Sequence, residues 1–136
     1  MQPTLRMAHL VVGAIAVGAF LLTGMVMATH DPPVSAMDWG DRLLFRSRHI
    51  YLLGAGLVNL ALGVHFALPA GAARRGAAIA ASVLALASGP TLFFAFFAEP
   101  MAGRPPGQLS AFGLFALFGG VVLYTLVSLG RGKAAS

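Results

Sequence analysis

Hydrophobic and polar positions divide this chain into four long apolar segments separated by short polar connections. The pattern predicts helices over about residues 6–29, 40–68, 75–98 and 108–130. Each apolar segment is long enough to cross roughly 30 Å of hydrocarbon as a helix. The alternation of apolar and polar residues that is typical of a β-barrel is absent. Helices are then the structure in which every backbone N–H and C=O group can be hydrogen-bonded inside a bilayer. We therefore expect an all-α, integral membrane four-helix bundle that forms one transmembrane domain over residues 1–136.

The connections between these segments carry residues that stop or start helices. Pro32 and Pro33 end the first helix, and Asp38 is expected to cap the second, which then begins near Trp39. Because short connections make successive helices antiparallel neighbours, the expected topology is up-down-up-down. Within the third segment Pro90 removes one backbone donor and predicts a kink.

The first apolar segment must be distinguished from a cleaved signal peptide. It has a single arginine before an apolar stretch and ends in small residues that a signal peptidase accepts. Its apolar run, from Met7 to Ala28, is longer than the usual hydrophobic region of such a peptide. We therefore expect this segment to be retained as a helix.

The composition agrees with a membrane protein. Hydrophobic residues make up 58% of the chain and charged residues 10%, whereas a soluble domain is about 25% charged. So few charges do not cover a globular surface in water. The chain has no cysteine, which excludes disulfides, thiol catalysis and Fe–S clusters.

Charge is distributed unevenly between the two ends of the predicted bundle. The end with both termini and the second connection carries Arg6, Arg74, Arg75, Arg131 and Lys133, without an acid. The other end carries Arg42, Arg46, Arg48 and Arg104 together with Asp31, Asp38, Asp41 and Glu99. Lys and Arg are enriched on the cytoplasmic side, so both termini are expected in the cytoplasm of a bacterial-type inner membrane. Topology thus explains most of the net charge of +5, and nucleic acid is not an expected partner.

Small residues spaced by four predict faces for close helix packing. The row in the third segment consists of Ala77, Ala81, Ala85 and Gly89. In the second segment, Asn59 lies at mid-membrane, where an unpaired amide is costly. We expect its side chain to bond to another helix or to a partner chain. The apolar segments predict the lipid bilayer as one partner. The small-residue faces predict association in a homo-oligomer or a larger membrane complex.

The four histidines suggest candidate cofactor ligands. Within an antiparallel pair formed by the first two helices, His9 and His65 fall at similar depth near the cytoplasmic face, and His30 and His49 near the opposite face. Two histidines on facing helices are the ligand pattern of b-type haem. His49 and His65 lie about 160° apart around their helix, so at most one pair forms. His9 with His65 is the preferred pair and His30 with His49 the reserve. The alternative is interfacial histidines bonded to headgroups, carbonyls or water.

Two further groups of side chains lie near the non-cytoplasmic rim. Thioether and imidazole donors, which suit Cu(I), are Met25, Met27, His30, Met37 and His49. The alternative for the methionines is ordinary packing. Arg42 and Arg46 share a helical face and are expected to contact lipid headgroups or another anionic group.

The functional expectation follows from what the segments lack. No acid lies inside a predicted span, which counts against a cation-coupled transporter. No catalytic motif is evident. We therefore expect a non-enzymatic accessory or structural subunit. The alternatives are an electron-transfer protein with b-type haem or a quinone between the first two helices, and an oligomeric channel for a small solute.

Overall fold

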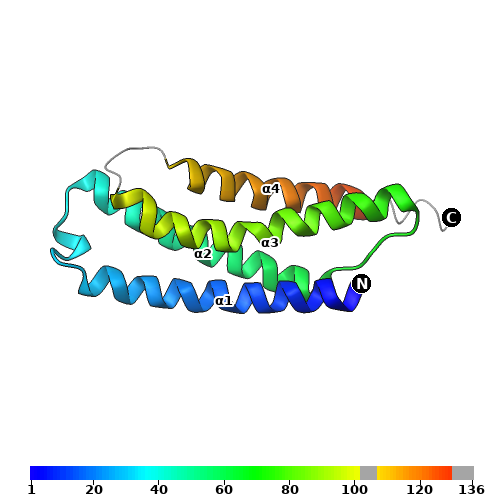
Figure 1. The fold of residues 1–136 in the computed structure, drawn as a ribbon, viewed down its shortest axis with the longest axis horizontal. Coiled ribbons are helices and arrows are strands. Elements are labelled where there is room, and N and C mark those ends of the chain that lie inside the picture. The colour runs from blue at the N-terminus through cyan, green and yellow to red at the C-terminus, as the bar shows by residue number, and fades with distance from the viewer. Residues whose placement is uncertain (102–106, 130–136) are drawn as a thin grey trace.

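The computed structural model describes residues 1–101 and 107–129, and these form four long helices and one short 3-10 helix (Figure 1). The elements are α1 (Gln2–Thr29), η1 (Val34–Ala36), α2 (Trp39–His65), α3 (Ala72–Met101) and α4 (Gln108–Leu129). The described residues include no strand. The prediction of an all-helical fold with four helices is confirmed.

Three of the helices, α1, α3 and α4, are long and apolar enough to cross a membrane. The second predicted span, α2, is not among them; besides its charged first turns, its apolar part contains Asn59 and ends at His65. The helix α3 continues past the expected end at residue 98 and includes Glu99 near its end.

Local sequence explains where α2 and α3 begin and end. Asp38 occupies the N-cap position of α2 with non-helical backbone angles, although its side chain makes no capping bond. At the other end, Phe66 is already extended, so the helix stops earlier than residue 68. Pro69 follows, and the residue before a proline disfavours the helical region. Gly71 then adopts a φ of 86°, which glycine tolerates, and α3 starts at the next residue.

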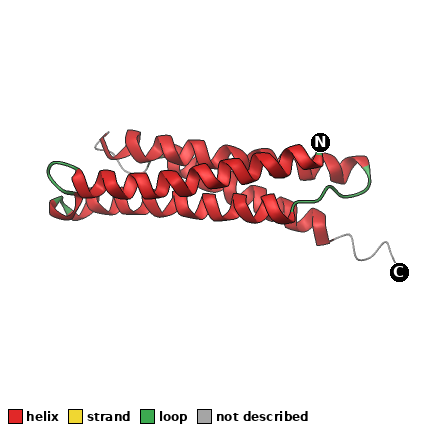
Figure 2. Ribbon diagram, turned by 90° about the horizontal axis from the view of Figure 1, so that it is seen from below, coloured by secondary structure: helices red, strands yellow, loops and turns green. Residues whose placement is uncertain are grey.

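The four long helices lie side by side along one long axis (Figures 1 and 2). The first turn of α1 and the last turn of α4 lie at the same end. The most extensive contacts are between α1 and α2 and between α3 and α4, and α2 and α3 join these two hairpins. Within the described residues, α4 touches α2 only slightly and makes no contact with α1. One long side of α4 is therefore left uncovered.

Glycines allow the backbones to approach closely in both hairpins. A Cβ added to Gly13 would lie 2.8 Å from the backbone nitrogen of Leu60, and one added to Gly56 would lie 3.1 Å from that of Val17. In the second hairpin, a Cβ at Gly120 would lie 2.7 Å from the carbonyl oxygen of Ala81. Contacts this close are what small residues permit at membrane helix interfaces.

The row of small residues in α3 takes part in this packing. Ala81, Ala85 and Gly89 are buried, whereas Ala77 is half-buried. A Cβ at Gly89 would meet Val12 of α1 at 3.2 Å. Most of the row is therefore used within the chain.

Polar and apolar side chains are distributed in the opposite sense to a water-soluble bundle. His9 and Asn59 are fully buried, at 0% exposure. Large apolar side chains face outward on all four helices, and Phe115 of α4 is 78% exposed.

Candidate functional site

The first buried polar cluster joins α1, α2 and α3. His9 of α1 lies between Asn59 of α2, with 2.7 Å from Nδ1 to Oδ1, and Ser82 of α3, with 2.8 Å from Nε2 to Oγ. All three side chains are buried. We call these residues the His9 cluster.

The donors and acceptors of this cluster follow from the amide of Asn59. Its Nδ2 donates to the carbonyl oxygens of Ala55, at 2.9 Å, and Ala85, at 3.1 Å. Its Oδ1 is therefore the acceptor, and His9 donates to it through Nδ1. The hydroxyl of Ser82 then donates to Nε2 of His9. Both ring nitrogens of His9 are used inside the protein.

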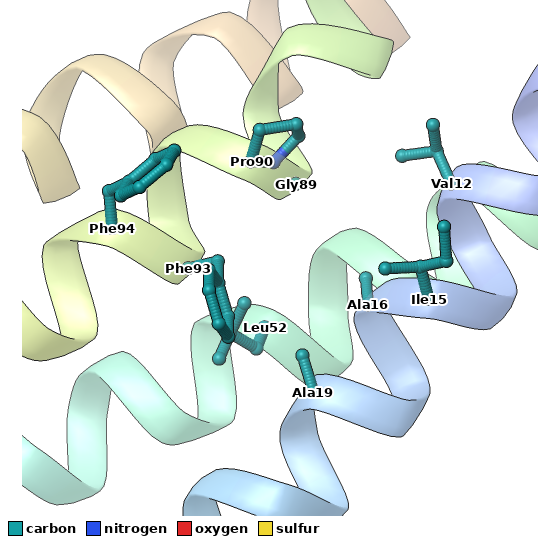
Figure 3. Close-up of a pocket in the computed structure, with 9 residues that line it drawn as sticks. All are labelled: Val12, Ile15, Ala16, Ala19, Leu52, Gly89, Pro90, Phe93 and Phe94. Atoms are coloured by element: carbon teal, nitrogen blue, oxygen red, sulfur yellow. The ribbon is translucent and has the colours of Figure 1, made fainter.

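An apolar cavity of about 200 Å³ lies between α1, α2 and α3, beside Pro90 (Figure 3). Side chains of Val12 and Ile15 on α1 lie across it from Phe93 on α3, and Leu52 contributes from α2 (Figure 3). No polar side chain lines it. It can therefore hold hydrocarbon, but it offers no side-chain group for chemistry. The kink predicted at Pro90 stays a prediction.

The second buried polar cluster lies toward the opposite end and joins α2, α3 and α4. Nε of Arg48 donates to Oε2 of Glu99 at 2.6 Å, and the two side chains are only 4% and 8% exposed. Ser110 donates its backbone N–H to Oε1 of Glu99 at 2.9 Å and its hydroxyl to Oε2. We call these residues the Arg48–Glu99 cluster.

Glu99 also stabilises the start of α4. Ser110 is in the first turn of that helix, where backbone N–H groups lack partners and a negative charge is favoured by the helix dipole. A Cβ at Gly107 would overlap the carboxylate of Glu99, so only glycine allows this approach. The carboxylate thus acts as a cap supplied by a neighbouring helix.

Sequence reasoning missed this cluster because it treated Arg48 and Glu99 as charges at the rim and in a connection. They are 51 positions apart, and neither belongs to a recognised motif. One signal was present: Glu99 directly follows an apolar segment at the end where the second helix carries its arginines. An acid and a base at equal depth on adjacent helices are candidates for a pair.

The four predicted histidines lie in different surroundings. His65 is exposed, whereas His9 is buried with both nitrogens bonded. In the reserve pair, Nδ1 of His30 lies 3.0 Å from the carbonyl oxygen of Pro32. Nδ1 of His49 lies 2.9 Å from the hydroxyl of Thr23. His9, His30 and His49 thus each have a hydrogen-bond partner other than the predicted one, and haem binding stays a prediction.

The predicted soft-metal donors lie in different surroundings. Met25 is 66% exposed, whereas Met27 and Met37 pack against the core cluster around buried Val34. Across residues 1–101 and 107–129, no three histidine or acidic side chains gather around a position that could hold a metal. The copper site stays a prediction without a common centre.

The arginines expected at the headgroups occupy the start of α2. Nη1 of Arg42 donates to the carbonyl oxygen of Ser35 at 3.3 Å. Arg46 is exposed and lines an open groove next to Ser35 and Met27. Headgroup contact by these side chains stays a prediction.

At the other end, Arg6 of α1 caps the end of α2, which sequence reasoning did not anticipate. Its Nε donates to the carbonyl oxygen of Gly63 at 3.1 Å, and its Nη2 to that of Val64 at 2.6 Å. These carbonyls are in the last turn of the helix, where a positive charge is favourable.

Comparison of the chain with family models, curated proteins and solved structures finds no match. The function must therefore be argued from the two clusters, the outward apolar surface and the helix arrangement.

Proposed function

We propose that this chain is an integral protein of a bacterial-type inner membrane, with four spanning helices in up-down-up-down order and both termini in the cytoplasm. Support comes from three helices with the length and apolarity of spans, and from the outward apolar surface. The first turn of α1 and the last turn of α4 at one end support a common side for the termini (Figure 1). The basic residues at that end favour the cytoplasm.

In this proposal α2 is the fourth span despite its charges. Arg48 is paired with Glu99 inside the bundle, so its charge is not presented to lipid. The part of α2 that follows, from Ile50, is largely apolar; it contains Asn59, whose amide is bonded internally, and ends at His65. Pairing of this kind is how ionisable groups are accommodated at membrane depth.

We further propose a non-catalytic role as an accessory or structural subunit of a homo-oligomer or larger membrane complex. The observation that carries this proposal is that interior polar side chains are bonded to one another across helices, as in the His9 cluster and the Arg48–Glu99 cluster. Such bonds stabilise a fixed bundle. The uncovered side of α4, with exposed Phe112, Phe115 and Phe118, remains for lipid or a partner helix.

Topology is tested by single cysteines, because the chain has none of its own. Ser35→Cys lies at an exposed position between α1 and α2, and Ala73→Cys lies at an exposed position in the first turn of α3, at the opposite end of the bundle. In intact cells, a membrane-impermeant maleimide should label Ser35→Cys only, and both variants should react after lysis. Labelling of Ala73→Cys alone would reverse the orientation, and labelling of both in sealed right-side-out vesicles would refute spanning.

The subunit role is tested by mild-detergent extraction followed by native mass spectrometry. We expect an oligomer or a complex with a defined second membrane protein. Phe115→Ser, on the uncovered side of α4, should weaken that assembly more than Ile15→Ser on α1, which is also exposed. A lone monomer at every detergent concentration would contradict the subunit proposal without affecting the topology.

A further inference from the structure

A groove of about 360 Å³ lies between α2 and α4 beside the Arg48–Glu99 cluster. It forms where α4 diverges from α2, since these helices touch only slightly. Its polar groups come from Ser47, Arg48, Tyr51 and Ser110. Its apolar lining includes Leu44, Ala111 and Leu114. The groove therefore has one polar and one hydrocarbon-like surface.

Arg48 supplies more donors to this groove than the protein uses. A guanidinium carries five N–H groups. Nε donates to Glu99, and one N–H of Nη1 donates to the carbonyl oxygen of Leu44 at 3.2 Å. Within the part of the chain that the structure describes, the remaining N–H groups have no acceptor. Because Arg48 lines the groove, these N–H groups are donors that the protein can offer to a molecule bound there.

The charges decide what kind of partner fits. Glu99 cancels the charge of Arg48, so the polar side of the groove is formally neutral and an anion gains little there. The unused groups of Arg48 are donors only, so the ligand must provide an acceptor. Leu44, Ala111 and Leu114 require that the rest of the ligand be apolar. An uncharged amphiphile with a carbonyl oxygen at its polar end meets all three conditions.

We propose that this groove binds the carbonyl-bearing end of an uncharged membrane amphiphile. The carbonyl oxygen accepts hydrogen bonds from Arg48, and the hydrocarbon part lies against Leu44, Ala111 and Leu114. An isoprenoid quinone and an acylglycerol ester both present this chemistry. The proposal rests on the membrane location proposed above but not on the subunit role, because binding is measured on the isolated protein.

The test uses purified protein in detergent and three probes at matched concentrations: decylubiquinone, monoolein and dodecane. A ligand that binds only the folded state raises the midpoint of thermal unfolding. We expect a saturable rise of several degrees with at least one carbonyl probe and none with dodecane. Ala111→Phe, which fills the groove, should weaken the apparent affinity at least tenfold. Ala61→Phe, at an exposed position of α2 outside the groove, is the matched control and should bind as the natural chain does.

Each outcome is decisive. A rise with decylubiquinone alone assigns a quinone, a rise with monoolein alone assigns an ester, and a rise with both supports the shared carbonyl chemistry. An equal rise with dodecane would overturn the role of Arg48, and an undiminished rise in Ala111→Phe would overturn the location. No rise with either carbonyl probe would overturn the proposal. Far-UV circular dichroism verifies the fold of each variant, and Ala111→Leu replaces Ala111→Phe if the larger side chain prevents folding.

Discussion

The His9 cluster and the Arg48–Glu99 cluster each join three helices, but they do so with different chemistry. In the His9 cluster, uncharged groups pair side chain to side chain, and the amide of Asn59 adds bonds to carbonyls of α2 and α3. In the Arg48–Glu99 cluster, an ion pair is completed by the start of α4, and donors of Arg48 are left facing a groove. The first cluster is closed, whereas the second is both a structural joint and an opening for a ligand.

This difference also sets the cost of disturbing each cluster. Uncharged hydrogen bonds between membrane helices contribute about 0.6–2 kcal/mol each, because the unfolded chain in lipid finds other partners. An ion pair that loses one member leaves a buried charge and costs about 3–5 kcal/mol. The predictions below run from the largest expected effect to the smallest.

The largest effect is expected for Glu99→Gln, which keeps the shape of the side chain but leaves Arg48 as a buried, unpaired charge. The free energy of unfolding should fall by about 3–5 kcal/mol, measured by denaturation in mixed micelles. The double variant Arg48→Met/Glu99→Gln should recover more than half of this loss, because no isolated charge remains. A double variant as unstable as the single one would show that charge is not the cause.

Gly107→Ala should have the next largest effect, since the added Cβ overlaps the carboxylate of Glu99. The carboxylate must move from the start of α4, with a loss of up to about 3 kcal/mol in the free energy of unfolding. Gly119→Ala is the matched control, because a Cβ there meets nothing within 4 Å. Equal stability of the two variants would contradict the proposed cap.

Two serines allow the clusters to be compared directly. Ser110→Ala removes a hydroxyl that donates to a charged acceptor, and about 1.5–3 kcal/mol should be lost. Ser82→Ala removes a hydroxyl that donates to an uncharged imidazole, and about 0.5–1.5 kcal/mol should be lost. If unfolding measurements reversed this order, the distinction between a charged and an uncharged cluster would fail.

A comparably small effect is expected for the coupling between His9 and Asn59. A double-mutant cycle with His9→Ala and Asn59→Ala should give an interaction energy of about 0.6–2 kcal/mol. His65→Ala combined with Asn59→Ala is the control and should give none, because His65 is exposed. Additive effects of His9→Ala and Asn59→Ala would mean that their hydrogen bond contributes nothing to stability.

Sequence patterns predicted the helices well because apolar length and helix-stopping residues act locally. The expected starts and ends lie within a few residues of those observed, and the exceptions have local causes, such as Pro69 after α2. The need of Asn59 for a partner in another helix could also be argued from its position in an apolar segment. The identity of its partners could not be predicted, because it depends on how α1 and α3 are rotated against α2.

The candidate ligand pairs show the limit of depth as a criterion. Equal depth put His9 beside His65, but rotation about the helix axes instead turns His9 to Asn59 and leaves His65 exposed. Rotation also brings Arg48 to Glu99. From the sequence, Arg48 was expected at the rim and Glu99 in a connection. A small rotation of a helix about its axis can move a side chain from a buried partner to the exposed surface.

The sequence by itself determined that this protein is helical, that three of its helices are apolar enough to cross a membrane, and where the helices stop. These properties depend on neighbours along the chain and on total apolarity. Only the tertiary structure decided which polar groups meet, that most of the small-residue row in α3 is used within the chain, and that a groove opens beside Arg48. Those properties depend on helix rotation and close approach at Gly13, Gly56 and Gly120, where the absence of a single carbon atom sets the distance between backbones.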